Sequence, residues 1–281
     1  MLSRRRLLQA GGAAAVAAAA TGLYAWRIEP HWVEVTRRPL PVRGLPDKLA
    51  GRTLVQLSDL HVGPRVDDDY LLHCFEVVRA LAPDLVVMTG DLISYAPGIM
   101  RQAERVYAAL PRGRLGTFGS FGNHDYGERW QELGVATALQ DLLARHGLQV
   151  LRNEAADVGG LRLIGLEDLW SPGFDPAPAL AALPAGAPAI VLSHNPDAAD
   201  EAVWGAFAGW ILAGHTHGGQ CRPPFLPPPL VPVRNKRYTA GRFDLAGNRH
   251  LYINRGLGHL FRVRLNVRPE IAVFTLQAAE A

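Results

Sequence analysis

The pattern of hydrophobic and polar positions changes repeatedly along this chain, from short apolar runs to segments with apolar residues at helical spacing. Three short apolar runs in the first half predict strands, at 53–57, 85–88 and 115–121. Apolar residues at helical spacing predict the helices that follow them, at 68–81, 100–110 and 130–145. Further short apolar runs predict strands at 161–165, 189–192, 210–213, 250–253 and 271–274. Because runs that are apolar throughout are typical of strands buried on both faces, the pattern predicts a layered α/β architecture.

The first 26 residues follow a different pattern. Three arginines, Arg4 to Arg6, precede an apolar run rich in Ala and Gly that extends to Trp26, and no acidic residue occurs before Glu29. Residues 1–26 resemble a twin-arginine export signal. The resemblance implies export by the twin-arginine machinery to the periplasm or cell envelope. Residues 7–26 are also nearly long enough to remain as a membrane anchor, so a cleaved signal and an anchor are both open.

The segment 27–49 connects this signal or anchor to the layered part of the chain. It contains four prolines, and the alternating stretch from Trp32 to Thr36 predicts an edge strand there. We expect one domain over residues 50–281, without internal repeats. The two cysteines, Cys74 and Cys221, are compatible either with a disulfide of an exported protein or with two free thiols.

The composition indicates a globular protein, since 48% of the 281 residues are hydrophobic and 20% are charged. The formal net charge is +3, from 29 basic and 26 acidic residues. Three of the basic residues are the arginines of the N-terminal segment, and without them the 26 remaining basic residues balance the 26 acidic ones. Because a binder of polyanions carries an excess of positive charge, we expect no nucleic-acid partner.

Metal-ligating side chains follow the ends of the predicted strands. In chain order they are Asp59 and His61, Asp91, Asn123 with His124 and Asp125, His194, and His215 with His217. Each short motif alone occurs by chance, but the ordered set, each member after a strand, indicates a metal site. In open α/β sheets such loops meet at one sheet edge. The set supplies nitrogen and oxygen ligands for two divalent metal ions, and ligands without thiolate suit Mn, Fe or Zn in hydrolysis.

These motifs resemble the calcineurin-like metallophosphoesterase family, over about residues 50–220. The resemblance implies a four-layer α/β/β/α metallophosphoesterase sandwich that hydrolyses phosphoesters with two metals. The twin-arginine start, Gly218-Gly219-Gln220 and the stretch 252–258 before 268–271 resemble the branch of exported or membrane-associated bacterial phosphodiesterases. That branch implies a phosphodiester substrate in the cell envelope, with a phospholipid or a lipid-linked nucleotide as candidates.

The resemblance also gives roles to the matched residues. It implies a first metal held by Asp59, His61 and His217, and a second held by Asn123, His194 and His215. Asp91 would bridge the two, since a carboxylate has two lone-pair-bearing oxygens and a full negative charge. A hydroxide between the metals would then attack phosphorus.

His124 and Asp125 stand beside these implied ligands. We interpret His124 as the general acid for the leaving oxygen, or as a group that stabilises charge in the transition state. Asp125 either orients His124 or caps a turn, and the sequence leaves both open. The rival functions are an exported metal-binding protein without turnover and a nuclease, the latter disfavoured by the balanced charge.

A Pro-rich segment, 223–232, follows the last metal motif. It carries Phe225, Leu226, Leu230 and Val231, with basic residues on its flanks. An apolar loop with basic flanks beside the site would contact a bilayer surface or a lipid phosphate. The alternative is that these side chains pack on the domain, and the sequence does not choose between the two.

Overall fold

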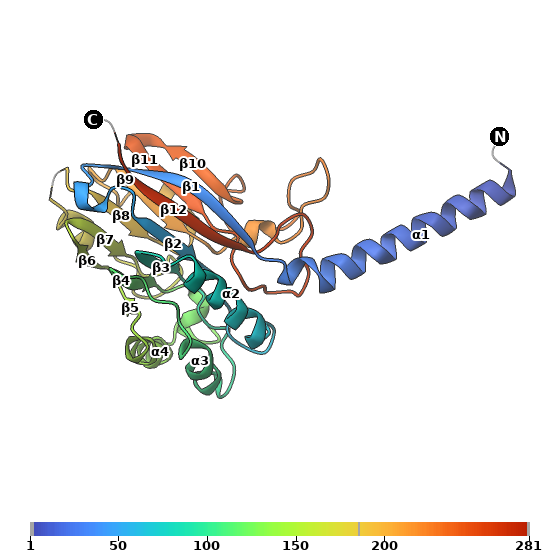
Figure 1. The fold of residues 1–281 in the computed structure, drawn as a ribbon, viewed down its shortest axis with the longest axis horizontal. Helices are drawn as coiled ribbons and strands as arrows, with labels where there is room; N and C mark the ends of the chain where they lie inside the picture. The colour runs from blue at the N-terminus through green and yellow to red at the C-terminus, as the bar shows by residue number, and fades with distance from the viewer. Residues whose placement is uncertain (1–2, 185, 280–281) are drawn as a thin grey trace.

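Two six-stranded sheets pack face to face in the computed structural model, which describes residues 3–184 and 186–279 (Figure 1). The first sheet contains, in spatial order, β1 (Glu34–Arg43), β12 (Glu270–Ala279), β2 (Thr53–Leu57), β3 (Leu85–Thr89), β4 (Gly116–Ser120) and β5 (Gln149–Val150). The second contains β10 (Gly241–Leu245), β11 (Arg249–Ile253), β9 (Gly209–Ala213), β8 (Ala189–Leu192), β7 (Leu161–Gly165) and β6 (Glu154–Val158). Within each sheet the central strands run parallel, β2-β3-β4 in the first and β7-β8-β9 in the second.

Helices cover the outer faces of the two sheets. The first sheet is covered by α2 (Asp68–Ala80), α3 (Ile99–Tyr107) and α4 (Leu133–Arg145), as Figure 1 shows. The second sheet is covered more thinly, by the short helix α5 (Ala177–Ala181) and the loops around it, which pack on Ile164 and Val191. The four-layer α/β/β/α prediction is therefore confirmed.

Side-chain alternation along the inner strands explains their continuous apolar runs. In β2, Leu54 faces the core between the two sheets, whereas Val55 and Leu57 face the helices. Both faces of the strand are thus buried, as the sequence pattern predicts. Cys74 of α2 lies in the helix-side core, and both it and Cys221 are free thiols, so the disulfide alternative is not realised.

Several predicted elements have different bounds in the structure, and for two of them the reason is clear. The strand expected at Trp32 to Thr36 lies at Glu34–Arg43, because all ten of its residues pair in parallel with β12. This part of the 27–49 segment is therefore an edge strand of the first sheet. The helix expected from Trp130 begins only at Leu133, because Trp130 has a left-handed backbone with a φ of 60°.

The N-terminal helix α1 (Arg4–Arg27) extends away from the sandwich (Figure 1). Its 24 residues span about 36 Å at the usual helical rise. Apart from its last turn, where Ala25 is buried, the described side chains of this helix are exposed or nearly so. Its length and composition suffice to cross a membrane, a property that it shares with signal sequences.

Candidate metal centre

The candidate ligands lie in the loops that follow the strands, at one edge of the sandwich. The first sheet contributes Asp59 and His61 after β2, Asp91 after β3 and Asn123 after β4; the second contributes His194 after β8 and His215 with His217 after β9. Among the described residues, three groups have their ligand atoms within 4.8 Å of one another: Asp59-His61-His217, Asp91-His194-His215 and His61-Asp91-His124. All of these side chains are buried except His124, which is partly exposed.

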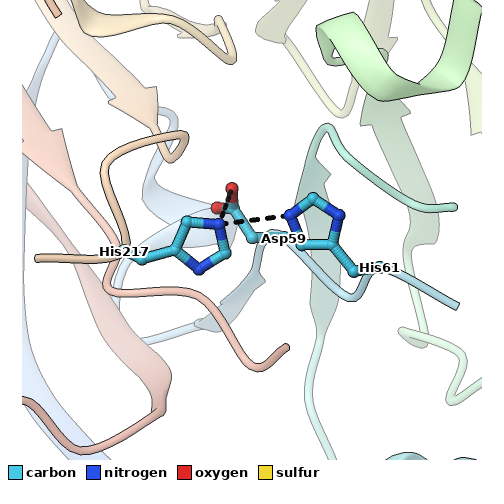
Figure 2. A group of neighbouring side chains, drawn as sticks. All are labelled: Asp59, His61 and His217. Atoms are coloured by element: carbon cyan, nitrogen blue, oxygen red, sulfur yellow. Dashed lines mark hydrogen bonds and ion pairs between the residues drawn. The ribbon is translucent and has the colours of Figure 1, made fainter. Parts of the chain in front are cut away.

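Figure 2 shows the group formed by Asp59, His61 and His217. The Nε2 atom of His217 lies 3.1 Å from Nε2 of His61 and 3.3 Å from Oδ1 of Asp59. The Nδ1 atom of His61 lies 2.9 Å from Ser94 Oγ, which fixes the orientation of that ring. Two imidazole nitrogens and a carboxylate oxygen therefore converge on one point.

The second group contains Asp91, His194 and His215. Oδ2 of Asp91 lies 3.2 Å from Nε2 of His194, which in turn lies 3.1 Å from Nδ1 of His215. The same Asp91 oxygen lies 3.5 Å from Nε2 of His61, in the first group. Asp91 therefore stands between the two groups, the place that a bridging carboxylate requires.

The tautomers of two histidines point to a cation. His194 donates its Nδ1–H to the carbonyl oxygen of Thr89 at 2.8 Å, and His215 donates its Nε2–H to that of Pro232 at 2.9 Å. A carbonyl oxygen only accepts, so each neutral ring presents a lone pair on its other nitrogen. These two lone-pair nitrogens face each other. Because two lone pairs repel at this separation, the contact requires a positive charge there, supplied either by a proton on Nε2 of His194 or by a metal ion that both nitrogens bind.

Burial determines the charge of three of the histidine rings, those of His61, His215 and His217. It lowers the pKa of both His61 and His215 to about 3, and that of His217 well below its usual value. These imidazoles are therefore neutral at neutral pH and offer lone pairs to a metal. Burial also acts to lower the pKa of His194, but the Asp91 carboxylate outweighs it and raises that pKa well above its usual value. A proton on His194 then neutralises Asp91 where a cation would otherwise do so.

The backbone at the ligands is left-handed. The φ angles are 51° at Asp59, 50° at His61, 52° at Asp91, 71° at His215 and 50° at His217. Residues other than glycine rarely adopt this conformation, and clusters of them occur at functional sites. Five of the seven candidate ligands therefore share this strained, left-handed backbone.

Two glycines leave room for the ligands. A Cβ atom at Gly122 would lie 2.3 Å from Oδ1 of Asp91, and one at Gly214 would lie 1.9 Å from Oγ of Ser58 and 2.4 Å from Oδ2 of Asp59. Neither position can hold a larger residue without moving the loop. The glycine that precedes each ligand in these motifs is thus a steric requirement of the site.

Asp125 caps a turn rather than orienting His124. Its buried carboxylate accepts hydrogen bonds from the backbone N–H groups of Leu92, Ile93 and Gly122, at 2.8 to 3.0 Å. It thereby ties the loop after β3 to the loop after β4. His124 is instead held through its own backbone N–H, which donates to Oδ1 of Asp91 at 2.9 Å.

Comparison with known proteins identifies the family to which the chain belongs. The family model described as Calcineurin-like phosphoesterase matches residues 52–219. The chain belongs to the calcineurin-like phosphoesterase family. It is therefore a hydrolase of phosphoester bonds, and the buried Asp and His groups are where the divalent metals of such an enzyme could bind.

Several curated relatives span nearly the whole chain. This phosphoesterase is 33% identical over 285 residues to Phosphodiesterase YaeI of Escherichia coli (strain K12), covering 98% of this chain and 100% of the relative. It is 33% identical over 290 residues to the uncharacterized metallophosphoesterase YkuE of Bacillus subtilis (strain 168), covering 99% and 98%. It is 27% identical over 310 residues to UDP-2,3-diacylglucosamine pyrophosphatase LpxG of Chlamydia trachomatis, covering 92% and 93%.

Two tryptophans beside the metal centre, Trp130 and Trp170, were not identified from the sequence. Trp130 and Trp170 stack with ring centroids 5.4 Å apart. Trp170 meets His215 edge-on at 4.7 Å, and Trp130 lies 5.7 Å from His124. One signal was available for Trp170, since Glu167 to Trp170 follows a predicted strand as the ligand motifs do. Trp130 offers no such signal, because it precedes a helix.

Proposed function

We propose that this chain is a two-metal phosphodiesterase. The observation that carries the proposal is Oδ2 of Asp91, which faces His61 of one ligand group and His194 of the other. Asp59, His61 and His217 would hold one cation, and Asn123, His194 and His215 the other, with Asp91 between them. When bound, two divalent cations polarise the phosphoryl group and activate water. Oδ1 of Asn123, buried and without a hydrogen-bond partner among the described residues, supports its place as a ligand.

His124 is the general acid in this proposal. Its backbone is held on Asp91, and its partly exposed ring can meet the leaving oxygen of a bound phosphodiester. Donation of its proton would neutralise the charge that develops on that oxygen. Since one of its ring nitrogens lies within 4.8 Å of ligand atoms of His61 and Asp91, a ligand role is the alternative.

The substrate that we propose is a phosphodiester of the cell envelope, a phospholipid or a lipid-linked nucleotide. Relatives named as a phosphodiesterase and as a pyrophosphatase of a diacylated sugar nucleotide support this class. The apolar helix α1 supports export through the twin-arginine machinery, with residues 1–26 as a signal or, through 7–26, an anchor. Residues 27–49 would then lead from the membrane to a catalytic domain at 50–281, and they would also contribute β1 to the first sheet of that domain.

The test is hydrolysis of bis(p-nitrophenyl) phosphate by the full chain in detergent, loaded with Mn. Replacing Asp91→Asn is expected to lower kcat by more than about 100-fold, because changes to outer-shell partners of ligands alone cost up to that much. The matched control is Asp141→Asn, an exposed carboxylate on α4, with unchanged kcat. Full activity of a metal-loaded Asp91→Asn variant would refute the mechanism.

The two rivals give different results in the same assay. If the purified protein holds metal but hydrolyses no member of a panel of phosphoesters, the result would support the hypothesis of an exported metal-binding protein without turnover. Cleavage of DNA, with binding that weakens steeply as salt rises, would support the nuclease.

A further inference from the structure

An apolar surface lies at the end of the sandwich from which α1 departs. Phe225 is fully exposed there, and Leu226, Leu230 and Phe261 are 60 to 65% exposed. These residues come from two segments, the Pro-rich loop 223–232 and the loop 260–263, which together we call the docking surface. Val231, in contrast, is buried. Of the four non-proline apolar residues in the Pro-rich loop, it is therefore the one that packs on the domain.

Hydrogen bonds from one side chain hold the second loop in place next to the metal motif. Nε2 of Gln220, which directly follows the motif, donates to the carbonyl oxygens of Phe261 and Val263, at 2.7 and 2.9 Å. The Pro-rich loop is held from the other side, since His215 donates to the carbonyl oxygen of Pro232. Both parts of the docking surface are therefore connected to the loop that carries two candidate ligands.

A cavity of about 270 Å³ lies between the two loops. Leu230, Pro232, Leu260, Phe261 and Val263 give it apolar walls, and His217 of the metal centre forms part of its lining. Pockets for drug-sized molecules usually begin at about 300 Å³. The cavity therefore suits one segment of an acyl chain better than a whole polar head group.

The end of α1 is attached to the segment that follows the second loop. The backbone N–H of Arg264 donates to the carbonyl oxygen of Ala25 at 2.9 Å, and that of Val267 donates to Glu29 at 2.6 Å. In Figure 1 the long helix leaves the body beside these C-terminal loops and the projecting Pro-rich loop. An apolar helix that enters a bilayer here would bring the docking surface to the same side of the membrane.

Exposed tryptophans surround this attachment. Trp26 and Trp32 are both about half exposed, with the guanidinium of Arg27 5.0 Å from the first ring and that of Arg268 4.1 Å from the second. Tryptophan and arginine at the end of an apolar helix are typical of the boundary between membrane and water. The stretches 221–232 and 257–268 contain no Asp or Glu, which favours contact with anionic lipids.

We propose that the docking surface inserts into a lipid bilayer and that the cavity behind it receives an acyl segment of a phosphodiester lipid. The lipid then reaches the metal centre past His217 without leaving the membrane. The catalytic part of this inference rests on the proposed function, whereas the insertion of the loops does not. An exposed apolar surface of this kind, next to the segment that holds the end of a helix of membrane-spanning length, has a bilayer as its natural partner.

The insertion is tested without any enzymatic assay. The full chain carries an environment-sensitive nitrobenzoxadiazole label at Leu226→Cys in a Cys221→Ser background, with the buried Cys74 left in place. It is reconstituted in vesicles of phosphatidylethanolamine and phosphatidylglycerol that contain spin-labelled lipid. The control is a label at Leu115→Cys, an exposed leucine just before β4, at the strand end opposite the metal centre. We expect several-fold stronger quenching at the first position than at the second.

Two results would overturn the insertion. Equal quenching at the two positions would mean that the loop stays in water. A signal that follows protein concentration rather than lipid would assign the surface to a second copy of the chain.

The lipid route is tested by comparing two substrates. Phe225→Ser combined with Leu226→Ser is expected to slow hydrolysis of a dye-labelled phosphatidylethanolamine in the same vesicles by about tenfold, because two apolar side chains are lost from the bilayer. Hydrolysis of bis(p-nitrophenyl) phosphate in detergent is expected to stay unchanged, and Leu115→Ser to leave both rates unchanged. Equal effects on both substrates, or none, would overturn the lipid route. A wild-type chain that hydrolyses neither would refute the proposed function, while the quenching still decides the insertion.

Discussion

The buried histidines of the centre are oriented from behind by acceptors of the protein itself. Thr89 and Pro232 accept from His194 and His215 through backbone carbonyl oxygens, and Ser94 fixes His61 through its hydroxyl. Second-shell contacts of this kind determine which ring nitrogen faces a metal. The residue types of the ligands can be read from the motifs, but these orienting contacts cannot, because two of them use backbone atoms that any residue could supply.

A prediction at this scale concerns His124. If it is the general acid, His124→Ala lowers kcat by about 100-fold or more for an alkyl phosphodiester, whose leaving oxygen needs a proton. For bis(p-nitrophenyl) phosphate, whose leaving group is stable as an anion, the loss is much smaller. Metal content by mass spectrometry stays the same. A variant that binds less metal and loses both activities equally would instead make His124 a ligand.

At the scale of elements, the strands that could be predicted are those whose sequence pattern arises from local burial, and those that depend on a distant partner could not. The runs at 53–57 and 85–88 predicted β2 and β3 because a strand that is buried on both faces needs apolar residues at successive positions. The bounds of β1 were missed because its length depends on pairing with β12, more than 200 residues away, and because its two prolines, Pro39 and Pro41, are unusual inside a paired strand. The contacts among the strand-end loops could likewise be expected only as a common edge, without distances.

The starts of three strands share one carboxylate, Asp84. It accepts from the backbone N–H of Thr53 at 2.9 Å and forms ion pairs with Arg52 and Arg114 at 3.1 and 3.0 Å. Burial alone would raise the pKa of Asp84, but these contacts together lower it below its usual value. A carboxyl with a lowered pKa in the folded state stabilises the fold above its unfolded pKa of about 3.9, and this stabilisation disappears as pH falls through the folded pKa.

We therefore expect Asp84→Asn to lower the free energy of unfolding by about 1.5–3 kcal/mol at pH 7, the range for a hydrogen bond to a charged group. The difference from wild type is expected to shrink as pH falls below about 4, where first the unfolded state and then the folded state takes up a proton. Urea unfolding with chelator present, at several pH values, measures it, with the exposed Asp141→Asn as control. A difference that stays constant down to pH 3 would mean that shape rather than charge is responsible.

At the scale of the whole molecule, the centre joins the two sheets. Asp59, Asp91 and Asn123 extend from the first sheet, whereas His194, His215 and His217 extend from the second. Two cations held between these sets would connect the halves of the sandwich at one edge. Without cations, that edge contains the buried carboxyl group of Asp59, whose pKa burial raises to about 7.

Removal of metal should therefore lower the melting temperature. A ligand at 100 times its dissociation constant stabilises the native state by about 2.7 kcal/mol. For a chain of this size that corresponds to about 5–10 °C in Tm. Differential scanning fluorimetry of the full chain in detergent, Mn-saturated and then chelated, measures the shift. The control is a variant with His194→Ala and His217→Ala, which lacks one ligand of each metal and should melt at nearly the same temperature in both conditions. Equal melting temperatures of the wild type with and without Mn would contradict a cation-linked sandwich, because a bound cation must stabilise the state that holds it.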